Sequence, residues 1–297
     1  MSRYLGAVAG AVLLTGGIAG TAQAVPYAYA NVNFSNVVLN GLANPNLTIT
    51  GATVTTSSSA NYPGAAGSAN SAPATNSGTG LTPLTGGSDA AQSTSGTGPF
   101  PGQNVFTQAL QAGSGSRGDS VITGNLTTGS GAASDVAEGR LTAPGSAASS
   151  GGTTTGFSLN ATITAPTTLA LDLSASTSLI ATTTAVGDGA SAQINASFTV
   201  TGANGALISN FAPDALNRSV SSTSNQGNAS LSSGLTAYNT SVTLAPGTYQ
   251  ISLLSGAQER LEAVAAVAPP AVPEPASLAL LGAGLLGLGM ARRRQQG

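Results

Sequence analysis

Apolar and polar residues alternate with a period of two over much of the chain, and this constrains the fold more than any other feature. The alternation is clearest within residues 156–268, for example over 157–163, 169–175 and 194–200. Successive side chains of a β-strand point to opposite faces, so the pattern indicates strands with one buried and one solvated side. Several such strands at short spacing predict an antiparallel β-sandwich or a jelly-roll-like body.

Turn residues divide the pattern further. Residues 242–253 contain Pro246-Gly247 between two alternating runs, which predicts a hairpin with a type II turn. Residues 25–54 predict two strands joined by a turn at 44–46. Residues 257–267 fit either a last strand or a short helix, and the sequence leaves both open.

Two segments lack large apolar residues. Residues 55–102 are rich in Ser, Thr, Gly, Ala and Asn, and residues 103–155 contain only short apolar runs. A stretch that buries little surface cannot offset its ordering entropy. We therefore expect a flexible low-complexity loop over 55–102, an irregular segment with short strands over 103–155, and the sandwich over 156–268.

The N-terminus has the pattern of a secretory signal peptide. Arg3 precedes an apolar run over 5–18, and Ala22-Gln23-Ala24 forms a small-residue cleavage site. We expect a signal helix in residues 1–24, export through the Sec translocon, and cleavage between Ala24 and Val25. The alternative is a retained membrane anchor, but the apolar run is shorter than the roughly 17 residues of a spanning helix.

The C-terminus combines three features. Pro273-Glu274-Pro275 keeps the backbone extended and accessible, because proline disfavours helix before it. An apolar run over 276–291 follows, which we expect to be a transmembrane helix. Positive residues stay in the cytoplasm, so the body should lie outside. The basic cluster that ends the run consists of Arg292, Arg293 and Arg294.

This arrangement over residues 272–297 resembles the PEP-CTERM sorting signal of Gram-negative bacteria. The resemblance implies exosortase as a processing partner, transient anchoring in the inner membrane, and removal of the tail near Pro273-Glu274-Pro275. It also implies delivery of the body to the cell surface or extracellular matrix. The alternative is an ordinary tail anchor that is never cut, but a plain anchor does not need the Pro-Glu-Pro residues.

Short stretches of the body resemble a family of exosortase-dependent surface proteins. That resemblance implies surface display and no catalytic activity. The stretches are residues 27–31, 98–102, 116–120, 135–139, 211–214 and 244–249.

Composition excludes several kinds of chemistry. The chain has no His, no Cys and no Lys, and charged residues are 6% of it. A serine–histidine relay, imidazole ligands and thiolate zinc sites are therefore excluded. The formal net charge is −2 with no basic patch, so nucleic-acid binding lacks its electrostatic basis. We expect no cofactor, no metal site and no enzymatic activity.

Remaining candidates in the body are weak. Arg117-Gly118-Asp119 is the tripeptide that integrins bind, but we interpret it as structural. Asp135 and Glu138 are three residues apart, yet nothing nearby in sequence is apolar enough to raise a pKa. The dispersed Asp172, Asp188 and Asp214 lack the close spacing of a calcium loop. Tyr27, Tyr29, Tyr238 and Tyr249 could stack on sugars, but we expect them to pack in the core or at turns.

These observations predict a mainly β protein: an antiparallel β-sandwich or jelly-roll-like body with long low-complexity loops, an N-terminal signal helix and a C-terminal transmembrane helix. We expect an exported structural protein of the surface or matrix, associated with exopolysaccharide or biofilm. The alternative is a carbohydrate-binding or adhesive β-sandwich module.

Overall fold

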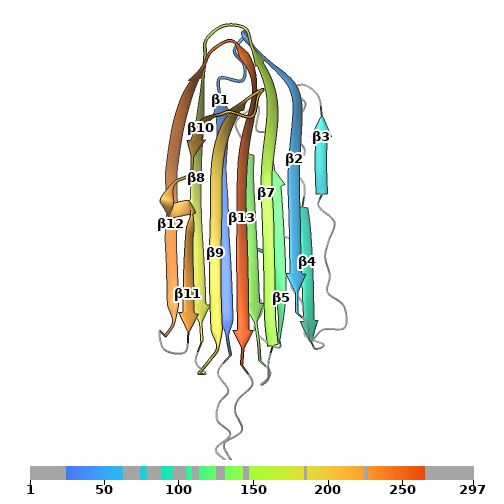
Figure 1. The fold of residues 1–297 in the computed structure, drawn as a ribbon, viewed down its shortest axis with the longest axis vertical. Helices are drawn as coiled ribbons and strands as arrows, with labels where there is room; N and C mark the ends of the chain where they lie inside the picture. The colour runs from blue at the N-terminus through green and yellow to red at the C-terminus, as the bar shows by residue number, and fades with distance from the viewer. Residues whose placement is uncertain are drawn as a thin grey trace, which may run out of the picture.

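A computed structural model describes residues 25–62, 74–78, 88–95, 105–108, 114–124, 131–142, 147–183, 186–223 and 227–264. They form two antiparallel sheets packed face to face (Figure 1). Three expected features lie outside the described residues: the signal helix, the sorting residues and the helix over 276–291. Of the residues at the expected signal-peptide cleavage site, the structure describes only Val25. Within the described ranges, no helix has the length and apolar character needed to cross a membrane.

The first sheet has the strand order β12-β8-β1-β6-β5-β4. The second has the order β10-β9-β13-β7-β2-β3, and β11 also pairs with β9. The strands of the first sheet are β1 (Tyr27–Asn40), β4 (Ser88–Ser95), β5 (Ser114–Thr123), β6 (Gly131–Arg140), β8 (Thr167–Thr182) and β12 (Ala229–Leu244). Those of the second are β2 (Leu47–Asn61), β3 (Ala74–Gly78), β7 (Ala147–Ile163), β9 (Gly189–Gly202), β10 (Leu207–Phe211), β11 (Arg218–Thr223) and β13 (Gly247–Ala263). A 3₁₀ turn, η1 (Asp214–Leu216), precedes β11.

The period-two pattern correctly indicated which side chains are buried. In β7, Phe157 and Leu159 point into the core, and β8 alternates buried and less buried residues along its whole length. Together with Phe34 and Phe198, these residues belong to one apolar core between the sheets. The prediction of an antiparallel two-sheet body is therefore confirmed.

The predicted hairpin over 242–253 is wrong. β12 lies in the first sheet and β13 in the second, so Pro246 marks a crossing between sheets. The turn over 44–46 likewise carries the chain from β1 to β2 in the other sheet. Alternation shows which face of a strand is buried, but both sheets bury apolar faces. It therefore cannot identify the neighbouring strand.

Strands also run through 55–102, where we expected a flexible loop, and through 103–155, where we expected an irregular segment with short strands. β2 continues to Asn61, β3 and β4 lie within 55–102, and β5, β6 and the start of β7 lie within 103–155. Many of the buried positions there are small or polar, such as Thr56, Ser58 and Thr155. An expectation based on large apolar residues misses such strands. Of the two alternatives for 257–267, the strand is observed, because β13 extends to Ala263.

The sheets approach closely at the end where these small residues lie. A Cβ added to Gly118 would be 2.9 Å from the carbonyl oxygen of Gly152 and 3.0 Å from that of Ser59, both in the second sheet. Backbone atoms held in a sheet cannot easily move away. Gly118 thus permits an inter-sheet contact that any side chain would obstruct.

We therefore predict that Gly118→Ala destabilises the fold by about 1–3 kcal/mol, the usual cost of overpacking. Gly234→Ala is the matched control, because nothing lies within 4 Å of a Cβ added there. Denaturant unfolding of both variants and the wild type measures the difference. Equal stability of the two variants would show that the sheets separate more easily than the structure indicates.

Candidate functional site

Five charged residues of the sandwich are buried at the end where β1 begins and β13 ends. Arg117, Asp119, Asp135, Glu138 and Glu259 are each at most 3% exposed. We call these five residues and their hydrogen-bond partners the buried polar cluster. Charged side chains are almost never fully buried unless they are paired, so their partners decide what the cluster does.

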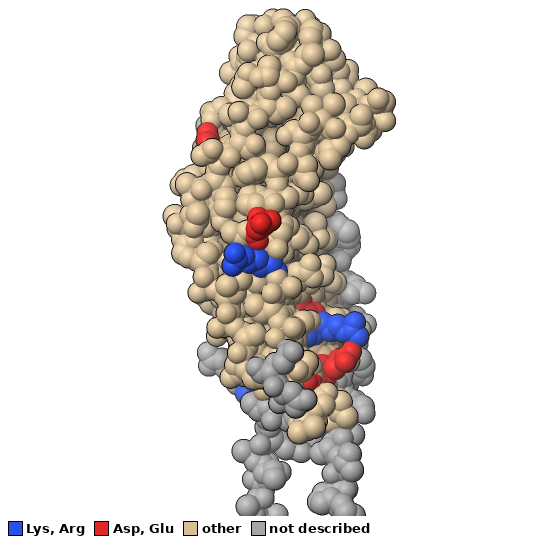
Figure 2. Space-filling model, turned by 60° about the vertical axis from the view of Figure 1, so that its left-hand side comes forward, with Lys and Arg blue, Asp and Glu red and all other residues tan. Residues whose placement is uncertain are grey.

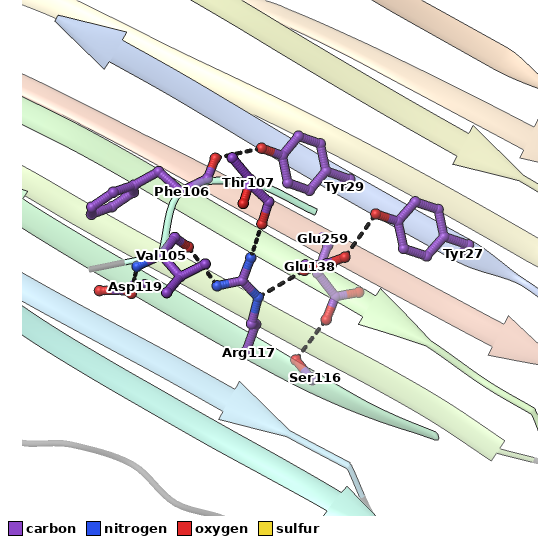
Figure 3. Close-up of polar contacts among 10 residues, drawn as sticks. All are labelled: Tyr27, Tyr29, Val105, Phe106, Thr107, Ser116, Arg117, Asp119, Glu138 and Glu259. Carbon is purple, nitrogen blue, oxygen red and sulfur yellow. Dashed lines mark hydrogen bonds and ion pairs between the residues drawn. The ribbon is translucent and has the colours of Figure 1, made fainter. Parts of the chain in front are cut away.

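One ion pair forms the outer layer of the cluster, on the outer face of the first sheet. Arg117 on β5 lies opposite Glu138 on β6. The Arg117 Nε donates to Oε2 of Glu138 at 2.7 Å, and the Tyr27 hydroxyl donates to Oε1 at 2.7 Å (Figure 3). Both carboxylate oxygens of Glu138 therefore accept hydrogen bonds.

Residues 105–108 form a covering segment over this ion pair. The guanidinium of Arg117 donates to the carbonyl oxygens of Val105, at 2.6 Å, and Thr107, at 2.5 Å. The Tyr29 hydroxyl donates to the carbonyl of Phe106 at 2.7 Å (Figure 3). The Val105 amide donates to Asp119 Oδ2 at 2.8 Å. The segment has no regular secondary structure, and the side chains beneath it form hydrogen bonds with its backbone groups.

Asp135 belongs to the inner layer, between the sheets. Its carboxylate accepts hydrogen bonds from Thr155 Oγ1 on β7, at 2.7 Å, and from Ser255 Oγ on β13. Burial raises the pKa of Asp135 to about 6, and these hydroxyl donors partly oppose the increase. The contacts connect β6 of the first sheet to two central strands of the second.

Glu259 crosses the same space in the opposite direction. It extends from β13 toward the first sheet and accepts a hydrogen bond from Ser116 Oγ at 2.6 Å. A side chain at Gly139 would collide with this carboxyl group. Burial raises the pKa of Glu259 to about 8, opposed by the Ser116 and Ser149 hydroxyls and reinforced by the charge of Glu138. At neutral pH Glu259 is therefore mainly protonated.

The tyrosines of the cluster act as hydrogen-bond donors. Burial and the nearby Glu138 raise the pKa of Tyr29 to about 12, and that of Tyr27 further above its ordinary value. Both phenols therefore stay protonated over the physiological pH range. Tyr29 is buried and Tyr27 is partly buried, while Tyr238 and Tyr249 pack against the core.

The carboxyl groups of Asp135 and Glu138, which the sequence analysis considered as a possible pair, lie on opposite sides of the first sheet. Asp135 contacts the second sheet, whereas Glu138 contacts Arg117 and Tyr27 on the outer side of the first. They do not face a common space in which a substrate could lie between them. The expectation that neither pKa would be raised is wrong for Asp135, because strands distant in sequence supply its burial.

The Arg-Gly-Asp tripeptide has the structural role that we expected, although it lies in a strand. Arg117 and Asp119 are buried under the covering segment, so an integrin cannot reach them. Asp172 accepts a hydrogen bond from Asn40, and Asp188 accepts one from the Val264 amide. In the part of the chain that the structure describes, no three or more acidic residues gather in a way that could hold a metal ion.

The comparisons with known proteins concern the C-terminal tail. Residues 271–294 match the PEP-CTERM protein-sorting motif. The match confirms the interpretation of the Pro-Glu-Pro residues, the apolar run and the arginines as one signal. It supports exosortase-dependent sorting of an exported protein to the cell envelope or surface. No curated protein and no solved structure matches this chain.

The ion pair leads to a prediction about stability. Arg117→Met removes the cation that pairs with the buried Glu138 and frees two carbonyls of the covering segment. The expected cost is about 3–5 kcal/mol of unfolding free energy. The double variant Arg117→Met/Glu138→Gln should recover part of this loss, since it removes the uncompensated charge. Denaturant unfolding of the three proteins measures both effects.

The matched control is Arg260→Met. Arg260 pairs with Glu262 at 2.6 Å, but the two side chains are 72% and 55% exposed. Such surface pairs contribute about 0–1 kcal/mol. A similar loss in Arg260→Met and Arg117→Met would contradict a special role for the buried pair.

The raised carboxyl pKa values predict a pH dependence. Native Asp135 and Glu259 hold protons at pH values where the unfolded chain has released them. Stability therefore falls as pH rises from about 4 to about 8, and the decline then levels off. Glu259→Gln should flatten this dependence between about pH 5 and about pH 8, because the amide does not titrate. Melting temperatures measure it, with the exposed Glu262→Gln as the control that keeps the wild-type slope.

Proposed function

We propose that this chain is an exported structural protein of the cell surface or extracellular matrix of a Gram-negative bacterium. Exosortase cuts it near Pro273-Glu274-Pro275, and the released sandwich associates with exopolysaccharide or biofilm. The observation that carries the proposal is the sorting motif over 271–294, which follows closely after the last strand of the body.

The position of the motif supports a temporary tether. β13 ends at Ala263, and residues 264–270 can span at most about 25 Å when fully extended. β1 begins at the end of the sandwich where β13 ends (Figure 1). The hydrogen bond from Ser116 to Glu259 lies near this end. Before cleavage the body therefore stands close to the membrane, with the buried polar cluster at its near end.

A structural role, not an enzymatic one, is supported by how the charges are distributed. The carboxyl groups with raised pKa values are enclosed between the sheets, and the covering segment shields the ion pair. Figure 2 shows few charged side chains on the face in view, and only the uppermost part of that face shows none. A surface dominated by hydroxyl and amide groups can make hydrogen bonds to hydrated glycans without selecting for charge.

An adhesive or carbohydrate-binding module is the second candidate. Rows of hydrogen-bonding side chains on the outer face of the second sheet favour it. In these rows Gln250 lies between Asn160 and Thr201, and Ser252 lies between Ser158 and Thr199. Saturable binding of the released protein to particular glycans on an array would favour this candidate over a matrix component.

The sorting proposal predicts the masses of two forms. Wild-type protein from the surface and secreted fractions should begin at Val25 and lack the tail beyond the Pro-Glu-Pro site. The variant with Pro273→Ala, Glu274→Ala and Pro275→Ala should keep its tail and stay in the membrane fraction. Pro269→Ala/Pro270→Ala is the control, because these prolines precede the matched residues. Intact-mass spectrometry separates the forms, and normal tail loss in the triple variant would refute the proposal.

A further inference from the structure

β12 forms a long edge of the first sheet. It contains 16 residues and pairs with β8 on one side, and no described strand pairs with its other side. The other edge strands of the described residues are shorter: β4 has 8 residues, β11 has 6, and β3 and β10 have 5 each. A long edge presents a row of backbone donors and acceptors to which another strand can bind.

Residues 229–244 lack two common means of preventing edge pairing. They include no charged residue and no proline. The pairing with β8 is irregular between Ser233 and Thr236, and such a bulge limits edge pairing locally, but the register is regular on either side of it. At this point, near the middle of the strand, the Leu235 side chain is 67% exposed. A strand that pairs with this edge would cover that apolar side chain.

The side of the molecule that carries β12 has few charges. In Figure 2, where the β12 side of Figure 1 comes forward, the charged side chains form a few small groups, some with both signs side by side. A partner whose own edge carries charge would leave those charges uncompensated here. A partner with an equally neutral edge would not.

We propose that β12 pairs with β12 of a second copy of this chain, in antiparallel orientation. Two identical edges related by a two-fold axis are self-complementary, because each residue meets the same contacts in both copies. With the axis near Leu235, the two leucine side chains lie beside each other and cover their apolar surface. No like charges oppose one another, since the strand has none. The two first sheets then form one continuous sheet.

This geometry also determines when pairing can occur, a step that rests on the proposed function. Antiparallel pairing turns one copy end over end, so the two tethered ends lie at opposite ends of the pair. The ends are then separated by about the length of β12, roughly 54 Å at 3.4 Å per residue. Residues 264–270 reach only about 25 Å. Two copies that stand upright on one membrane therefore cannot pair until their tails are cut, because the tail of the inverted copy is too short to reach that membrane.

Cysteine cross-linking tests the pairing, because the chain has no cysteine of its own. Mature Leu235→Cys protein, recovered from the secreted fraction, should form a disulfide-linked dimer under mild oxidation. Leu254→Cys is the matched control, since Leu254 is also exposed but lies on the central strand β13. Equal cross-linking at the two positions, or none at Leu235, would overturn the proposal.

Light scattering over a concentration series gives an independent readout. Wild-type mature protein and Leu254→Lys should both form dimers, whereas Ser232→Lys/Leu235→Lys should remain monomeric. Circular dichroism checks that all three are folded. A monomeric wild type with its β12 amides protected from hydrogen exchange would show that another segment of the same chain covers the edge, which overturns the proposal.

The dependence on cleavage is tested with Leu235→Cys protein whose Pro-Glu-Pro residues are also changed to alanine, so that it stays in the membrane. We expect no disulfide-linked dimer of this protein in the membrane fraction. Cross-linking as efficient as in the secreted protein would overturn that dependence. Loss of pairing with normal tail removal would refute the inference while leaving the sorting proposal intact.

Discussion

The Arg117–Glu138 ion pair holds the covering segment, which has no regular secondary structure, against the outer face of the first sheet. A single guanidinium satisfies a carboxylate on β6 and two carbonyls of the covering segment. Glu138 in turn accepts from Tyr27 on β1. Below this layer, Asp135 and Glu259 connect the two sheets through hydroxyl donors. At this end the sandwich relies on hydrogen bonds where most sandwiches rely on large apolar side chains.

The reliance on polar contacts follows from composition. The apolar core around Phe34, Phe157 and Phe198 occupies only part of the space between the sheets. Elsewhere the inward positions are Ala, Ser, Thr and Gly, so the backbones approach closely enough for short side chains to meet. Gly118 and Gly139 make this approach possible, since added side chains would meet a carbonyl oxygen and the Glu259 carboxyl group. Buried polar residues in such a space need complete hydrogen bonding, because an unpaired group would lose its solvation without compensation.

This division explains what the sequence could and could not predict. The strand face was predictable wherever large apolar residues alternate, as in Phe157 and Leu159. The strands around Thr56 and Arg117 were not, because their buried residues are of types usually found on surfaces. The candidate site had no local signal, since Tyr27, Arg117, Glu138 and Glu259 converge from four strands far apart in sequence. The sorting signal was predictable because its information is local: three adjacent residues, an apolar run and a basic end.

The crossings between sheets have a consequence for the speed of folding. Because β1, β7, β8 and β12 are each followed by a strand of the other sheet, their partners lie far away in the chain. Tyr27, for example, pairs with Arg140 and Thr182. A fold of such high contact order closes long loops before most of its contacts form, so it folds slowly. Slow folding leaves the newly made chain unfolded for longer, which suits the proposed export of the chain before its sheets assemble.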